Sequence, residues 1–205
     1  MATNALRFIL ETLGQLWLLA VLLRFFAQAV RVPFRARAGN PLADFIMALT
    51  DWAVLPARRL VPSIRNFDLA TFFVAWVAST LLALLVFALL GLANLAHPSF
   101  WMALISYAAV ELIKLSIYLF IALIIIQAVF SWVSPYHPLQ PFFAALTRPL
   151  VQPLQRFIPL IGGVDLSPLL AILFLQVILI GPVAFLSGEA KAALSLASRV
   201  FVPGQ

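Results

Sequence analysis

The sequence predicts an all-α fold: a polytopic membrane protein whose four transmembrane helices form two parallel-repeat hairpins, each with an amphipathic interfacial helix. Composition is the first observation behind this prediction. Of the 205 residues, 64% are hydrophobic and 10% are charged, and the mean hydropathy is +1.10. Polar residues are therefore too few to cover a soluble domain of this size. The other two observations are four long apolar segments and an internal repeat.

The four apolar segments are each long enough for the roughly 20 helical residues that cross a bilayer. Glu11 and Arg24 interrupt the first segment and no small-residue cleavage site follows it, so we expect an uncleaved span and not a signal peptide. The stretch 99–109 (SFWMALISYAA) is shorter and is expected to be an interfacial lead-in to the third span. The predicted spans are residues 8–30, 69–93, 112–133 and 166–187.

An internal repeat emerges when the chain is shifted by 97 positions. Residues 41–72 then align with residues 138–169 without a gap, and 13 of the 32 pairs are identical. Leucine pairs arise easily at this composition, so the other identities carry more weight: Pro41/Pro138, Thr50/Thr147, Pro56/Pro153, Arg59/Arg156, Pro62/Pro159 and Asp68/Asp165. We interpret residues 1–96 and 97–190 as two copies of one unit within a single membrane domain, followed by a C-terminal tail at 191–205.

Between its two spans, the first copy has a segment at 41–62 that is expected to form an amphipathic helix in the headgroup plane. Asp44, Asp51 and Arg58 recur on one of its faces. Its apolar face is predicted from helical periodicity to hold Leu42, Phe45, Ile46, Leu49 and Ala53.

The matching segment at 138–159 of the second copy has the same pattern. Pro149 and Pro153 are expected to kink it or divide it into two pieces. For both segments a re-entrant helix packed into the bundle is the alternative, and periodicity does not distinguish the two arrangements. The predicted apolar face of the second segment holds Leu139, Phe142, Phe143, Leu146 and Leu150.

The positions of the arginines predict the orientation in the membrane. An even number of spans separates the two amphipathic segments, so both are expected on the same side. The loop 31–65 holds six arginines, and the matching loop adds Arg148 and Arg156. Because cytoplasmic loops are enriched in Lys and Arg, these loops are predicted to be cytoplasmic and both termini to face outward. Parallel repeats also argue against an inverted-repeat transporter.

A Pro-x-x-Arg-x-x-Pro motif links each amphipathic segment to the next span. On the structural interpretation this is an elbow, in which Arg59 or Arg156 contacts lipid phosphate or caps helix carbonyls, and Asp68 or Asp165 caps the span that follows. On the functional interpretation, Arg59 pairs with Asp68 and Arg156 with Asp165, and these polar centres bind an anionic lipid or a partner.

Gly162 and Gly163 form a predicted turn in the second elbow, where the first has Arg65 and Asn66. Arg24 is a separate candidate because it lies within a predicted span. A charge there commonly marks function or a buried partner. Arg24 is expected to reach the interface or to form a structural ion pair, and a transport role is the alternative.

The sequence predicts no enzymatic activity, no catalytic residue, no metal ligand and no cofactor. There is no cysteine, which excludes disulfides and thiolate sites. His97 and His137 are predicted on opposite sides of the membrane, and Ser131, Ser134 and Thr147 have no neighbouring base with an orienting acid. The net charge of +6 comes without basic runs interleaved with aromatics, so no nucleic acid contact is predicted.

These motifs together resemble the YggT family, small bacterial integral membrane proteins with relatives in cyanobacteria and plastids. The resemblance covers nearly the whole chain and rests on VLLRFFAQ (21–28), the duplicated Pro-x-x-Arg-x-x-Pro and Asp arrangement, and LTRPLVQPLQRFIPLIGGVDLSP (146–168). In the second copy the residues that match the family motif are Arg156, Pro159, Gly162, Gly163, Asp165, Ser167 and Pro168; in the first they are Arg59, Pro62 and Asp68.

The resemblance implies a multi-pass protein of the bacterial inner (cytoplasmic) membrane, tied to osmotic or ion stress tolerance, or, in plastid and cyanobacterial relatives, to division, nucleoid distribution or assembly of membrane complexes. It implies no catalytic activity. Two hypotheses follow. The first is a membrane scaffold or assembly factor that presents its interfacial helices to anionic lipids or to a membrane-protein partner. The alternative is an oligomeric channel or transport component for ions or osmolytes, with Arg24 near its pathway.

Overall fold

A computed structural model of the chain describes residues 2–31, 41–62, 68–134, 136–156 and 165–199. This described part is helical and contains no strand, which confirms the all-α prediction. The helices are α1 (Ala2–Ala29), α2 (Pro41–Leu60), α3 (Leu69–Leu89), α4 (Pro98–Val133), α5 (Gln140–Gln155), α6 (Ser167–Ile178) and α7 (Ala184–Arg199), with a π-helical segment η2 (Leu179–Val183) between α6 and α7.

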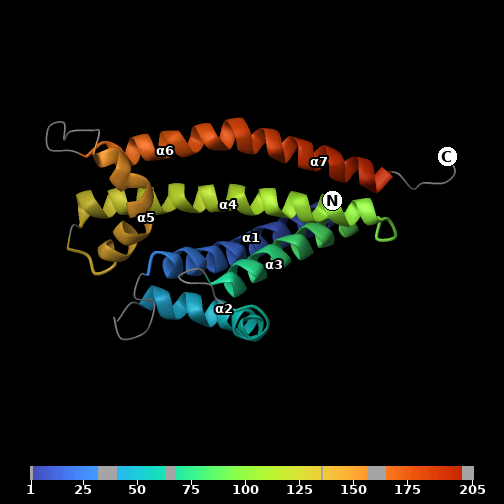
Figure 1. Cartoon of the computed structure of the whole chain (residues 1–205), viewed down its shortest axis with the longest axis horizontal. Coiled ribbons are helices and arrows are strands. Elements are labelled where there is room, and N and C mark those ends of the chain that lie inside the picture. The colour runs from blue at the N-terminus through green and yellow to red at the C-terminus, as the bar shows by residue number, and fades with distance from the viewer. Residues whose placement is uncertain (1, 32–40, 63–67, 135, 157–164, 200–205) are drawn as a thin grey trace.

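Four helical units of the described chain are long and apolar enough to cross a membrane: α1, α3, α4 and the continuous α6–η2–α7 unit, Ser167–Ser198. Figure 1 shows these units running alongside one another. The beginning of α1 and the end of α7 lie at one end of the bundle, and α2 and α5 lie toward the other (Figure 1). The chain is therefore a multi-pass membrane protein, as its composition predicts.

The third span differs from its prediction. Residues 99–109 are not a separate interfacial lead-in, because α4 runs without a break from Pro98 to Val133. Two charged residues directly after this stretch do not interrupt the helix: Lys114 Nζ lies 3.0 Å from a carboxylate oxygen of Glu111 one turn earlier. A charge pair three residues apart neutralises itself on the helix surface.

The fourth span is also longer than predicted. The helix continues through α7 to Arg199, past the expected end of the span at 187 and into the segment expected to be a tail. Pro182 does not end it. Proline has no backbone N–H and its ring collides with the carbonyl four residues before it, and the wider turn of η2 accommodates both effects around Pro182.

A tight connection joins α3 to α4. Gly91 has a φ of +68°, a left-handed conformation that glycine adopts without strain. The Gly91 amide donates to the Ala88 carbonyl at 3.0 Å and the Leu92 amide to the Phe87 carbonyl at 2.9 Å. This is the Schellman arrangement, which satisfies carbonyls at the end of a helix and lets the chain reverse within a few residues.

The helices pack around three buried clusters. The largest joins α1, α2, α3, α4 and α5; a second joins α3, α4 and α7; a third joins α4, α5, α6 and η2. Small residues let the spans approach closely: a Cβ added to Gly14 of α1 would lie 2.7 Å from Leu82 Cδ1 of α3. α4 contributes to all three clusters and is the central helix of the bundle.

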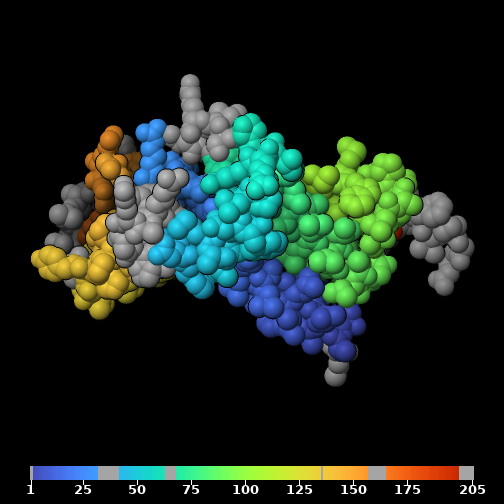
Figure 2. All heavy atoms as spheres, turned by 90° about the horizontal axis from the view of Figure 1, so that it is seen from below, coloured from blue at the N-terminus to red at the C-terminus, as the bar shows by residue number. Residues whose placement is uncertain are grey.

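The short helices α2 and α5 pack on different neighbours. α2 contacts α1 and α3, and α5 contacts α4 and α6. Viewed from below in Figure 2, α2 (cyan) covers part of α1 and α3. Despite Pro149 and Pro153, α5 is one continuous helix, because each proline removes a single intrahelical hydrogen bond and the buried side chains hold the helix in place. The residues that α5 buries are Phe142, Phe143, Leu146, Thr147 and Val151.

Candidate functional site

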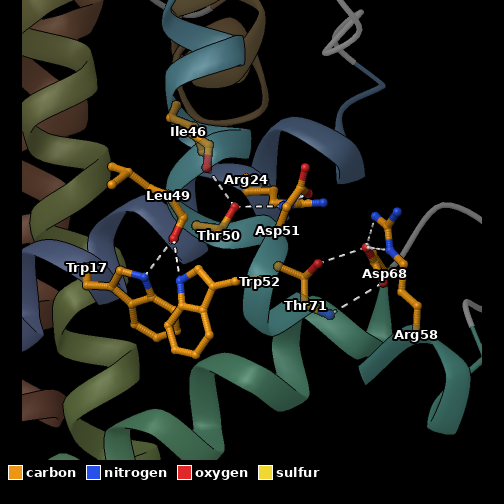
Figure 3. Close-up of polar contacts among 10 residues, drawn as sticks. All are labelled: Trp17, Arg24, Ile46, Leu49, Thr50, Asp51, Trp52, Arg58, Asp68 and Thr71. Carbon is orange, nitrogen blue, oxygen red and sulfur yellow. Dashed lines mark hydrogen bonds and ion pairs between the residues drawn. The ribbon is translucent and has the colours of Figure 1, made fainter. Parts of the chain in front are cut away.

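A buried ion pair attaches α2 to the first span. Arg24 of α1 is only 3% exposed, and its Nη1 lies 2.7 Å from Asp51 Oδ1 and donates to Thr50 Oγ1 at 2.7 Å. Thr50 in turn donates to the Ile46 carbonyl. Figure 3 shows these residues converging between α1 and α2. Arg24 therefore forms a structural ion pair, which was one of its predicted roles.

Trp17, about two turns before Arg24 on α1, makes a second attachment to α2, next to Trp52. The indole N–H groups of Trp17 in α1 and Trp52 in α2 both donate to the Leu49 carbonyl, at 3.0 Å and 2.9 Å. The two rings lie with their centroids 5.4 Å apart (Figure 3). Because Trp17 donates to a backbone atom of α2, the position of α2 depends on backbone as well as side-chain contacts.

A cluster around Asp68 fixes the start of α3. Its carboxylate accepts hydrogen bonds from the Thr71 hydroxyl at 2.8 Å and from Arg58 Nε at 3.0 Å, and forms an ion pair with the same Arg58 (Figure 3). In the orientation that satisfies both of its amide atoms, Gln28 of α1 donates to Asp68 at 2.8 Å and accepts from Arg58 at 3.0 Å. The cluster joins the ends of α1 and α2 to the first turn of α3.

The corresponding positions of the second copy form a similar cluster in which the partner of the aspartate is a neutral glutamine. Gln155, 97 residues after Arg58, donates to Asp165 Oδ2 at 2.7 Å, and the Ser167 amide donates to Asp165 Oδ1 at 2.9 Å. The two aspartates are placed differently: Asp68 is the N-cap residue of α3 and accepts from the Thr71 amide, whereas the N-cap position of α6 is Leu166 and Asp165, one residue earlier, accepts from the first amide of the helix. A second difference is that a charged arginine faces the carboxylate in the first copy and a neutral amide faces it in the second.

Two threonines 97 residues apart have the same environment. Thr50 and Thr147 are both completely buried, and each hydroxyl donates to the carbonyl four residues earlier in its helix. Each also meets a polar side chain of the preceding span, Arg24 for Thr50 and Gln127 for Thr147. A buried hydroxyl needs such partners, and here they connect each short helix to its span.

The predicted pairing of the elbow residues is wrong by one position in both copies. Asp68 pairs with Arg58 and not with Arg59, and Asp165 with Gln155 and not with Arg156. On a helix, adjacent residues point about 100° apart, so only one of two neighbours can face the aspartate. Arg59 and Arg156 are exposed instead. Gly162 and Gly163 lie outside the described residues.

Both aspartates are held in the charged state. Burial opposes ionisation of Asp68, but hydrogen bonds from Arg58 and Thr71 outweigh it and hold the pKa of Asp68 below its usual value. Burial likewise opposes ionisation of Asp165, and hydrogen bonds from Ser167 and Gln155 keep its pKa below the usual value. Hydrogen bonds to a carboxylate favour the charged form.

These pKa shifts predict a loss of stability in acid. A carboxyl with a depressed folded pKa stabilises the fold above its unfolded value, about 3.9 for aspartate, and loses that contribution as pH falls through the lower folded pKa. Asp68→Asn should therefore flatten the decline in thermal stability between about pH 5 and pH 3, measured by melting in detergent. Asp165→Asn, whose aspartate is more exposed, should flatten it less. Equal slopes for Asp68→Asn and the unmodified protein would contradict this.

A polar cavity of about 650 Å³ lies in the other half of the bundle, among α1, α3, α4 and α7. The charged side chains that line it are Arg7, Glu11, Glu111, Lys114 and Lys191. Neither Arg24, Gln28 nor Gln127 is among its lining residues. The sequence contains a signal for this cavity, since Glu11 and Glu111 both interrupt apolar spans, but periodicity within each helix does not indicate that they face a common space.

Comparisons with known proteins identify relatives over most of the chain. A family model described as CCB3/YggT matches residues 3–90 and 106–186. An uncharacterized protein encoded in the proC 3′ region of Vibrio alginolyticus is 35% identical over 189 residues, which cover 89% of this chain and 98% of the relative. The uncharacterized protein PA0392 of Pseudomonas aeruginosa is 35% identical over 83% of this chain and 84% of its own length. The uncharacterized protein YggT of Escherichia coli K12 is 30% identical over 87% of this chain and 89% of its own length. No solved structure matches the chain.

Proposed function

Because the chain belongs to the CCB3/YggT family and is a multi-pass membrane protein, we propose that it is a non-enzymatic assembly platform in the bacterial inner membrane. On this proposal α2 and α5 lie along the cytoplasmic headgroup region. Arg59 in the last turn of α2 and Arg156 directly after α5 contact anionic lipid, and α2 offers its exposed apolar face to another integral membrane protein.

The observation that carries the proposal is a difference between two equivalent phenylalanines. Phe142 in α5 is 5% exposed, whereas Phe45, at the same position of α2, is 63% exposed. Trp52, two turns after Phe45 on the same face of α2, is 70% exposed. The second copy covers this face with the bundle and the first copy leaves it uncovered, so α2 has a large apolar surface for lipid or for a partner.

The buried contacts of α2 support a fixed platform and not a loosely attached helix. α2 buries Ala43, Ile46, Thr50 and Val54, and Arg24 and Trp17 hold it to α1. A partner that binds a helix already held in place does not have to supply the free energy of ordering it. The polar contacts therefore prepare the apolar face for binding.

A transport component remains the second candidate, and the polar cavity favours it. Arg24, which was predicted to lie near a transport pathway, does not support this candidate, because it is paired with Asp51 and does not line the cavity. Proteoliposomes with the purified chain should show no ion or osmolyte flux above empty vesicles on the platform proposal. Flux that Lys114→Gln abolishes would favour transport.

Site-specific photo-crosslinking in native membranes tests the platform directly. A photo-reactive phenylalanine analogue placed at Phe45 or Trp52 should give a discrete adduct with one membrane protein, and Arg59→Glu should reduce its yield by weakening contact with anionic headgroups. The matched control is Leu85 of α3, which is 51% exposed on a span and should crosslink to no discrete protein. Identical adduct patterns at Phe45 and Leu85 would overturn the platform proposal.

A further inference from the structure

The cavity among α1, α3, α4 and α7 is separate from the α2 and α5 surfaces. It lies in the half of the bundle that contains the beginning of α1 and the end of α7 (Figure 1). Its volume of about 650 Å³ is within the range of roughly 300–1,000 Å³ that small-molecule sites occupy. The cavity is therefore large enough for a ligand, and its lining indicates which kind.

The lining includes charges deep in a span. Glu111 and Lys114 are the 14th and 17th residues of the 36-residue helix α4, about 20 and 24 Å along it at the usual rise per residue. Their side chains are 21% and 31% exposed, and both line the cavity. Charged groups inside a membrane are costly and face a cavity or pair with one another. Here they do both, which indicates a hydrated space that reaches well into the span.

The cavity lining has more basic than acidic side chains. Arg7 pairs with Glu11 at 2.9 Å, and Lys114 pairs with Glu111 at 3.0 Å. Both acidic groups of the lining are thus neutralised on their own helices. Lys191 of α7 also lines the cavity and forms no ion pair with any residue in the described part of the chain. One positive charge is left for an anion, and an ammonium group binds phosphate as a point charge.

The wall formed by α3 is mainly apolar. α3 contributes Leu82, Val86 and Phe87 to the lining, and Leu90 and Leu92 follow directly after it. The hydroxyl of Ser79, which also lines this wall, donates to the Ala108 carbonyl at 3.1 Å. A small inorganic anion gains nothing from such a wall, whereas the hydrocarbon next to a lipid headgroup does. A single ligand that matches both walls is an amphiphile with an anionic head.

We propose that this cavity binds the phosphate-bearing headgroup of an anionic phospholipid. Lys191 and the free donor capacity of Lys114 contact the phosphate, and the hydroxyl group of Tyr118, which also lines the cavity, contributes a further hydrogen bond. The Ser195 hydroxyl donates to the Ala192 carbonyl at 2.8 Å, so Ser195 adds surface to the site and no donor. The first carbons of the acyl chains lie against the α3 wall. A free phosphate ester carries the same anionic chemistry and is distinguished by experiment.

The test uses the full chain purified in a neutral detergent, with melting temperature and native mass spectrometry as readouts. Added phosphatidylglycerol should raise the melting temperature, and neither phosphatidylcholine nor inorganic phosphate should match it. Lys191→Gln should weaken phosphatidylglycerol binding about fivefold, as expected for losing one exposed charge contact. Ser195→Trp should remove binding by filling the cavity, and Ser195→Ala should retain most of it. Arg148→Gln, an exposed arginine on α5, should leave binding unchanged.

Several outcomes would overturn the proposal. Equal stabilisation by phosphatidylcholine removes the anion preference, and equal stabilisation by inorganic phosphate makes a free phosphate the ligand. If Arg148→Gln weakens binding as much as Lys191→Gln, the lipid binds through general surface charge. If Ser195→Trp does not fold, Lys191→Gln alone decides. Crosslinking from Phe45 does not involve this cavity, so the platform and the lipid site succeed or fail independently.

Discussion

Replacing Arg24 with methionine is expected to destabilise the protein by about 2–3 kcal/mol. Removing one partner of a buried ion pair costs about 3–5 kcal/mol because the other charge is left uncompensated, and the partial exposure of Asp51, 40%, lowers that figure. The loss should be seen in the free energy of unfolding, measured by reversible denaturation in mixed micelles. Crosslinking from Phe45 should fall with it, since α2 loses its attachment to α1.

A double-mutant cycle separates the ion pair from other effects of the substitution. Asp51→Asn alone should cost less than Arg24→Met, because Asp51 is closer to water, and the double variant should cost less than the sum of the two single variants. Arg59→Gln is the matched control: this arginine is exposed and its loss should change the free energy of unfolding by less than about 0.5 kcal/mol. Equal losses for Arg24→Met and Arg59→Gln would contradict the buried clamp.

Asp68→Ala should destabilise the protein by about 2–3 kcal/mol, and Asp165→Ala by only about 1 kcal/mol. Both variants lose a hydrogen bond from the carboxylate to a first-turn amide of a span, which costs about 1 kcal/mol. Asp68 is also a buried acceptor for Arg58 and Gln28, and these two groups would lose their partner. Among the described residues, the hydrogen bonds to Asp165 come from neutral groups, the Gln155 amide side chain and the Ser167 backbone amide.

The free energy of unfolding, measured by reversible denaturation in mixed micelles, tests this predicted difference between Asp68→Ala and Asp165→Ala. Introducing the neutral arrangement into the first copy provides a control: Arg58→Gln with Asp68 retained should cost less than Asp68→Ala, because a glutamine can still donate to the carboxylate as Gln155 does. A larger loss in the free energy of unfolding for Asp165→Ala than for Asp68→Ala would contradict this prediction.

The number of spans and the helical class could be predicted because they depend on composition and length alone. Segments of continuous apolar residues have few alternatives in a bilayer. Span ends were less predictable. The charged pair Glu111–Lys114 and the proline at 182 each predict the end of a helix when only nearby residues are considered. The helix α4 continues because the two charges neutralise each other, and the fourth span continues because the turn around Pro182 is wider.

The contacts of the candidate site could be predicted only in part. That Asp68 caps its span follows from its position in the sequence, and the same prediction for Asp165 is wrong by one residue, because the N-cap position of α6 is Leu166. Which of two adjacent residues faces each aspartate depends on the rotation of α2 and α5. The same rotation decides which face is buried. Phe45, Ile46 and Leu49 were all predicted on the apolar face of α2, but only Ile46 packs into the protein and the other two are exposed. The buried side also includes Thr50 and Val54. Hydrophobicity alone does not predict which face of a helix packs against the protein, because an apolar face can contact lipid instead.

The π-helical segment η2 corrects the phase of the fourth span. The buried positions Ser167, Ala171, Leu175, Val183 and Ser187 are separated by multiples of four residues. In a straight α-helix each four-residue step overshoots a full turn by about 40°, so this stripe would rotate to the far side of the helix before reaching α7. The wider turn of η2 rotates less per residue and removes part of this drift, and α6, η2 and α7 all contact α4. The insertion around Pro182 thus helps the fourth span to follow α4 along its length.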